Sequence, residues 1–277
     1  MLEIFEHDFM RLALLSMVIL GPACALMGVF ITLRGMSFFS DAIAHSTITG
    51  LALGLLIQDA LSTTFPTLLV VLFYSLLMAI CMAYLFTHTQ LRPDTIIAFS
   101  LTGSVALGII LIQYQGKARL LEGMLFGDIY ANTPADLLIQ AGLLIAILIF
   151  VAYYSERFLM LIVQPDMARA RQLNVTRLNF LFAVMIAAMI TVCLKMLGAL
   201  LLTAIIVIPA TSARFIARSF RHMLLMAALI GLIGGAAGVV LSAALDTSTG
   251  ATIVLTHIAI LFALLAPQIC LKAASKS

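Results

Sequence analysis

Long runs of apolar residues, separated by short polar segments, make up most of this sequence. An α-helix of about 20 apolar residues crosses the hydrocarbon core of a bilayer, so each long run is a candidate membrane span. The sixth and seventh runs meet at Lys195–Gly198, where the chain forms either a hairpin or one broken element. The pattern therefore predicts eight or nine spans, from runs at about 10–33, 41–57, 65–87, 94–113, 136–154, 178–196, 198–217, 222–245 and 251–271.

The composition excludes an ordinary water-soluble protein. Hydrophobic residues make up 64% of the 277 positions and charged residues only 10%, against roughly 25% charged residues in soluble domains. The mean hydropathy of +1.20 points the same way. We therefore expect an all-α fold, a polytopic transmembrane helical bundle that occupies residues 1–277 as one domain.

The distribution of Lys and Arg predicts the orientation. With the N-terminus outside and all nine spans threaded, eleven of the 15 basic residues fall on the inner side. Cytoplasmic loops carry an excess of Lys and Arg, so this arrangement puts the C-terminus in the cytoplasm. No basic face is available outside short loops, so nucleic acid is not expected as a partner.

Motifs for ATP hydrolysis and for common hydrolases are missing from the sequence. Gly116-Lys117 is followed by Ala118 and lacks the frame of a phosphate-binding loop, and neither HExxH nor GxSxG occurs. The four cysteines form no CxxC pair, so neither a disulfide framework nor a thiolate metal site is indicated. We therefore expect no enzymatic activity, and any ATP-driven transport would need a separate ATPase.

The sharpest polar interruption is the pair Asp41 and His45 in the second apolar run. Four residues apart, they share one face of a helix one turn apart. A carboxylate and an imidazole can contact a divalent first-row metal ion, and a two-fold dimer would offer two of each. The alternative is that Asp41 caps a helix at the membrane surface while His45 merely packs.

A second polar feature predicts a short cytoplasmic helix between two spans. Pro165 followed by Asp166 is a helix-start signal, and Asn174 is able to take the left-handed position that ends the helix. The segment is either a solvated loop helix or a docking element for a cytoplasmic partner.

Other residues are weaker candidates for a gate or a path. On the predicted outer side, Glu122, Phe126 and Asp128 lie among glycines in a segment that is a gate, a dock for an external protein or a plain loop. Pro209 falls inside an apolar run and removes a backbone donor there. His257 lies in the last run, where it lines the path or makes a hydrogen-bonded helix contact.

Six further motifs follow one another along the chain: Leu33–His45, Leu125–Asp128, Asp166-xxx-Ala170, Gly198–Leu201, Ile208–Ala213 and Gly250–Val254. In this order they resemble the metal-uptake permeases of bacterial ATP-binding-cassette importers, the zinc, manganese and iron branch. The similarity extends from about residue 20 to 265. Asn174 departs from the family pattern, which usually has Gly there, and Gly35 stands where a second basic residue is frequent.

The resemblance implies a homodimeric permease in the bacterial inner membrane. Cytoplasmic ATP-binding subunits would drive it and an extracytoplasmic metal-binding protein would deliver the cargo. Zn²⁺ is the favoured cargo, with Mn²⁺ or Fe²⁺ as alternatives, and no permanently bound cofactor is expected. The metal-contacting residues of the family fall on Asp41 and His45, and its ATPase-coupling helix falls on about 165–174, including Pro165, Asp166, Ala170 and Asn174.

Two other functional classes remain as alternatives. A proton-coupled secondary transporter would use Asp41 and His45 as a proton relay without an ATPase. It would give the 165–174 helix no role, so charge reversal at Arg169 and Arg171 would be harmless. An intramembrane hydrolase would need a nucleophile–base pair or a metal triad, and the sequence offers neither.

Overall fold

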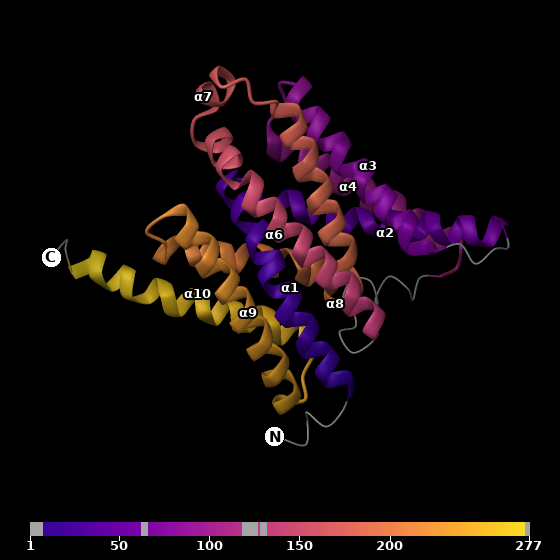
Figure 1. Cartoon of the computed structure of the whole chain (residues 1–277). Helices are drawn as coiled ribbons and strands as arrows, with labels where there is room; N and C mark the ends of the chain where they lie inside the picture. Colours follow the sequence, from indigo (N-terminus) through magenta and orange to yellow (C-terminus); the bar gives the residue numbers. More distant parts are fainter. Residues whose placement is uncertain (1–7, 62–65, 118–126, 128–131, 275–277) are drawn as a thin grey trace. The chain divides into compact units, whose positions relative to one another are not determined.

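The computed structural model describes residues 8–61, 66–117, 127 and 132–274, and helix is the only regular structure in these ranges (Figure 1). Eight of the described segments are long and apolar enough to cross a membrane. The predicted all-α, polytopic class is therefore confirmed. The helices are α1 (Asp8–Leu33), α2 (Ser37–Leu61), α3 (Thr67–His88), α4 (Pro93–Tyr114), α6 (Pro134–Val163), α7 (Pro165–Ala170), α8 (Val175–Ile216), α9 (Phe220–Leu245) and α10 (Thr249–Ala274).

The sixth and seventh apolar runs form one element that is broken at Gly198. There the backbone leaves helical geometry, with φ 67° and ψ 165°, a conformation that glycine adopts without the steric cost of a Cβ. The segment before the break reaches spanning length, whereas the segment Leu201–Ile216 is shorter. At 1.5 Å per residue the shorter segment extends about 24 Å, less than the hydrocarbon thickness of about 30 Å.

The helix boundaries follow local capping signals. Pro93 opens α4 at a position where its missing N–H costs nothing. Thr133 and Asp136 cap each other at the start of α6, since each backbone N–H donates to the other's side chain. Ser219 accepts a hydrogen bond from the backbone N–H of His222 and so caps α9.

The chain divides into two compact units that interleave along the sequence. The first unit comprises residues 1–32, 129–148 and 204–277, and the second comprises residues 33–128 and 149–203. The division falls within α6 and α8. The candidate metal site and the 165–174 segment both belong to the second unit.

Small residues let the helices of the first unit approach closely. A methyl group added at Gly231 of α9 would lie 2.5 Å from the carbonyl oxygen of Gly21 in α1. At Gly238, the same addition would come within 2.6 Å of the Cα of Ile253 in α10. Apolar side chains gain no hydrophobic free energy by leaving lipid tails for another helix. Helices in a bilayer therefore associate largely through close van der Waals packing of this kind.

In the second unit, α2 packs against α3 and α4. Gly50 and Gly54, whose spacing predicts close packing, both face α3, where added methyl groups would lie 3.0 Å from the Cα of Val71 and 2.6 Å from the Cγ2 of Thr67. Thr49 donates a hydrogen bond to the carbonyl oxygen of Ser104 in α4. The face of α2 that carries Gly50 and Gly54, opposite its polar pair, is thus fixed by tight contacts with α3, whereas Thr49 joins α4 from the side nearer the pair.

We expect Gly231→Ala to destabilise the protein by roughly 1–3 kcal/mol, because the new methyl group meets backbone that cannot move aside. The control is Gly142→Ala in α6, where nothing lies within 4 Å of the added methyl group. The midpoint of thermal aggregation of the detergent-purified protein measures the effect. Equal midpoints for the two variants would contradict the packing described here.

Candidate metal site

The turn between α1 and α2 determines where the polar pair sits on its helix. Gly35 takes a positive φ of 67°, and α2 then begins at Ser37, four residues before the second apolar run. Asp41 therefore lies in the second turn of α2. The alternative reading of Asp41 as a helix cap is wrong, because the helix starts one turn earlier.

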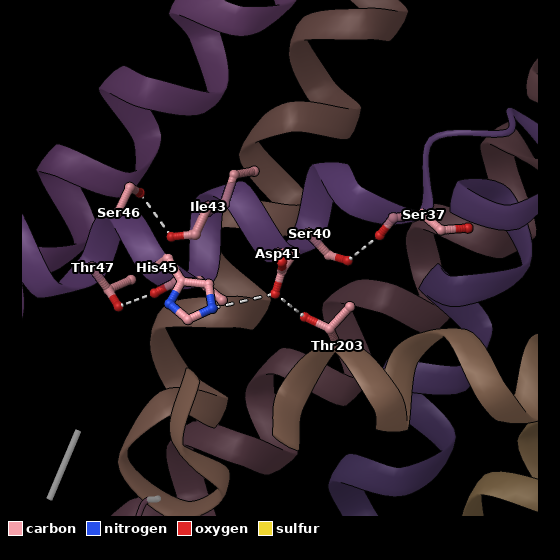
Figure 2. A network of polar contacts seen from close by, with 9 residues as sticks. Ser37, Ser40, Asp41, Ile43, His45, Ser46, Thr47 and Thr203 are labelled. Carbon is pink, nitrogen blue, oxygen red and sulfur yellow. Dashed lines mark hydrogen bonds and ion pairs between the residues drawn. The ribbon is translucent and has the colours of Figure 1, made fainter. Parts of the chain in front are cut away.

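Asp41 and His45 face each other on α2, as their spacing predicts (Figure 2). The Nε2 atom of His45 lies 3.5 Å from Oδ1 of Asp41, and both side chains are half-buried, with 17% and 26% of their surfaces exposed. A tetrahedral zinc ion bound by one nitrogen and one oxygen at about 2.0–2.2 Å holds these ligands about 3.3 Å apart. The observed separation is thus close to the one a shared ion requires.

Thr203 completes this arrangement and was not anticipated from the sequence. Its hydroxyl donates a hydrogen bond of 2.9 Å to Oδ1 of Asp41, across 162 positions of the chain. Thr203 lies in α8 just beyond the break at Gly198, so the short segment after the break supplies it. The hydrogen bond restrains the carboxylate, and both contacts of the described residues, from Thr203 and His45, are to Oδ1 and not to Oδ2.

The neighbouring hydroxyls of α2 are used for structure and not for the pair. Ser46 donates to the carbonyl oxygen of Ile43 at 2.7 Å, and Thr47 donates to that of Ala44. Both residues are fully buried. Donation to a carbonyl three residues earlier satisfies a hydroxyl inside an apolar bundle, so both hydroxyl protons are used within α2 and not for Asp41.

Within the described ranges, one copy of the chain offers two side chains, Asp41 and His45, as ligands at this site. No group of three or more His, Cys, Asp or Glu side chains that could hold a metal ion occurs there. Structural zinc sites use four protein ligands. A site with two protein ligands per chain is therefore suited to transient contact, or to completion by ligands from outside the chain.

The helix predicted at 165–174 is present but shorter. Pro165 and Asp166 open α7, which ends at Ala170. The residue with positive φ is Gln172 (54°) and not Asn174, so the prediction for Asn174 is wrong. The Asn174 side chain instead accepts a hydrogen bond of 3.0 Å from the backbone N–H of Arg177 and caps the start of α8.

One side of this segment is anchored and another side is open. Ala168 is fully buried. Its carbonyl oxygen accepts a hydrogen bond of 3.1 Å from the backbone N–H of Leu173, just after the end of α7. Asp166 and Ala170 are exposed, and Met167 exposes 49% of its surface. The geometry suits a short helix that presents a fixed surface to a partner.

The other candidate residues are placed as follows. Glu122, Phe126 and Asp128 lie outside the described residues, although Gly127 between them has a positive φ of 67°. A methyl group on Gly127 would lie 2.4 Å from the backbone nitrogen of Gly198, so this residue packs directly on the break in α8.

Pro209 and His257 belong to the first unit. Pro209 is buried within the short segment of α8. His257 is fully buried, its Nδ1 lies 2.8 Å from the carbonyl oxygen of Ile253, and its ring packs against Gly234 of α9. The described contacts of His257 are therefore those of a hydrogen-bonded helix contact.

Comparison with known proteins gives matches over nearly the whole chain. The chain is 31% identical over 244 residues to the "High-affinity zinc uptake system membrane protein ZnuB" of Haemophilus influenzae, covering 88% of this chain and 91% of the relative. It is 28% identical to the "Manganese import system permease protein ScaB" of Streptococcus gordonii, over 90% and 88% of the two chains. Among solved structures, "PsaBC from Streptococcus pneumoniae in complex with Fab" matches with a TM-score of 0.81 and 26% identity over 94% of this chain and 92% of the other.

The family is assigned from a family model, which matches a longer part of this chain than the two relatives do. The model of the ABC 3 transport family covers residues 6–268. This range includes every described candidate span, the Asp41–His45 pair and the 165–174 segment. The chain is therefore a multi-pass membrane protein that belongs to the ABC 3 transport family.

Proposed function

We propose that this protein is the membrane-spanning permease subunit of an ATP-driven importer that moves a divalent transition metal ion, zinc first, into the cytoplasm. The observation that carries the proposal is the half-buried Asp41–His45 pair, held at a metal-compatible separation on a membrane-length helix. Ionisable side chains within spans are costly and usually serve transport. Family membership and the names of the relatives support the same activity.

The proposed pathway brings two copies of the chain together at α2. One copy offers one carboxylate and one imidazole within the described residues, too few for a four-coordinate ion. A homodimer with α2 beside its two-fold axis would offer two of each, which bind an ion firmly enough to select it and loosely enough to release it. An extracytoplasmic metal-binding protein would supply the ion.

Separate cytoplasmic subunits would hydrolyse ATP in this proposal. The sequence has no phosphate-binding loop, and the exposed side of α7 is a fixed surface on which an ATPase could act. The same assembly would lie in the inner membrane, and the distribution of Lys and Arg would put the C-terminus in the cytoplasm when the short segment Leu201–Ile216 also crosses, as the ninth span. The secondary-transporter alternative gives α7 no role.

Zinc is proposed as the cargo ahead of manganese and iron. The zinc-system relative has the higher identity, 31% against 28% for the manganese-system relative. An imidazole paired with a carboxylate suits zinc and is also used for manganese and iron, so geometry and metal supply decide selectivity more than affinity does.

We expect Asp41→Asn and His45→Gln each to lower ATP-driven zinc uptake at least tenfold, because each removes a ligand. Asp59→Asn is the matched control, since Asp59 is also an acid of α2 but pairs with Lys117 at 2.7 Å on the surface. Uptake is measured in proteoliposomes that contain the permease and its ATPase, with zinc, manganese and ferrous ions in parallel. Wild-type uptake of all three ions by both variants would overturn the metal-contact role, and manganese uptake well above zinc would overturn the choice of ion.

We expect Thr203→Val to raise the zinc concentration for half-maximal uptake by roughly 2–10-fold, because one hydrogen bond to Asp41, worth about 0.5–1.5 kcal/mol, is lost. Thr203→Ser keeps the hydroxyl and should restore the wild-type value. The maximal rate should change less than the half-saturating concentration. A maximal rate that falls alone would assign Thr203 to folding or gating.

We expect Arg171→Glu, next to α7, to reduce ATP-driven uptake severalfold by weakening the contact with the ATPase. The control is Arg11→Glu in α1, which the charge distribution places at the opposite membrane face. Co-purification of the ATPase with the permease measures association directly. Uptake by the isolated permease under a proton gradient, unaffected by Arg171→Glu, would favour the secondary transporter.

A further inference from the structure

A cavity of about 370 Å³ opens in the second unit at one end of its helices. The end of α3, the start of α4, the end of α6 and the start of α8 meet around the turn between α1 and α2. Its wall is largely apolar and includes Phe39, Phe86, Leu161 and Phe182, whereas Arg34 and Asn179 are its main polar members. None of its lining residues is acidic.

Arg34 carries a charge at this cavity, and no carboxylate of the described residues pairs with it. Its guanidinium donates a hydrogen bond of 2.8 Å to Oδ1 of Asn179. It also lies over the rings of Phe158 and Phe182, 5.1 Å and 4.7 Å from their centroids. Ring faces and a neutral amide stabilise a cation only in part, and a guanidinium has five N–H donors.

The charge is retained at neutral pH although Arg34 is half-buried. Burial lowers the pKa of Arg34 to about 10, which leaves the side chain protonated at pH 7. The turn from Arg34 to Met36 lies between the two membrane-length helices α1 and α2. Positions between spans lie near the polar headgroups of a bilayer, so we expect this turn to lie where phosphate groups are abundant.

Large exposed apolar side chains follow the lining residues along the chain. Phe38, Val163 and Phe180 are each adjacent in sequence to a residue of the wall and expose 67%, 64% and 50% of their surfaces. A cavity of this size holds a headgroup and the upper part of an acyl chain, but not a whole two-chain lipid. The exposed apolar side chains would accommodate the remainder.

From these observations we propose that the cavity binds an anionic phospholipid, with its phosphate on Arg34 and Asn179 and an acyl chain along the apolar wall. A phosphate accepts two parallel hydrogen bonds from a guanidinium and supplies the missing counter-charge. An amphiphile fits better than a soluble anion, because most of the wall offers no hydrogen bonds. By the charge distribution of the chain, this lipid belongs to the cytoplasmic leaflet.

The lipid site lies in the same unit as α7, which the proposed function assigns to the ATPase. Residues just before and just after α7 line the cavity, Leu161 and Ile162 on one side and Val175 on the other. A bound lipid would therefore brace the two helices that carry α7. The binding proposal itself is independent of the metal and of the ATPase.

The test uses the full-length chain purified in mild detergent and titrated with phosphatidylglycerol, with phosphatidylcholine of the same acyl chains, or with inorganic phosphate. Native mass spectrometry counts bound lipid and a thermal assay follows the midpoint. We expect phosphatidylglycerol alone to bind tightly and to raise the midpoint. Arg34→Gln should weaken its binding at least tenfold, whereas Arg177→Gln, which alters an exposed arginine of α8, should not.

A second variant separates binding from folding. Ala183 is 1% exposed and lines the cavity, so Ala183→Leu fills the space without touching the guanidinium and should also abolish binding. Equal binding of both lipids, protection by inorganic phosphate alone, or undiminished phosphatidylglycerol binding in Arg34→Gln or Ala183→Leu would each overturn the proposal.

Discussion

A carboxylate on a membrane-length helix needs a donor or a cation, because hydrocarbon offers neither. Asp41 meets this requirement with one oxygen, Oδ1, which both the Thr203 hydroxyl and the His45 ring contact. Among the described residues these two contacts restrain the carboxylate from one side. An arriving cation would therefore find a ligand already oriented, which is the condition under which a weak two-ligand site is still selective.

A break in another helix lies close to this arrangement. Thr203 contacts Asp41 from the segment of α8 that follows Gly198, where the chain leaves helical geometry five residues earlier. Gly127 packs its backbone on that break, at a distance that leaves no room for a side chain. Two glycines with positive φ thus lie next to each other.

Asp41 and Arg34 lie on either side of the turn between α1 and α2, and their surroundings differ. Asp41 is half-buried and has polar partners, which fits the cation contact proposed for it. Arg34 lies seven residues earlier and has aromatic faces, one neutral amide and an apolar cavity. A cavity without acidic side chains cannot hold the metal ion proposed for the pair, and it complements an anion. The short turn through Gly35 therefore lies between the proposed metal-contact pair and the proposed binding site for a lipid phosphate.

Periodicity and composition were sufficient for the class of fold and for the facing of Asp41 and His45, because both depend on local helical geometry. Local signals were less reliable at Asn174, where two roles compatible with the same side chain competed and capping of α8 prevailed over termination of α7. Thr203 and the Arg34–Asn179 contact could not be inferred, since each joins residues more than 140 positions apart and no spacing rule extends that far. The sequence by itself therefore determined which residues are costly to place in a membrane, whereas only the tertiary structure decided which partners offset that cost, because those partners come from other helices.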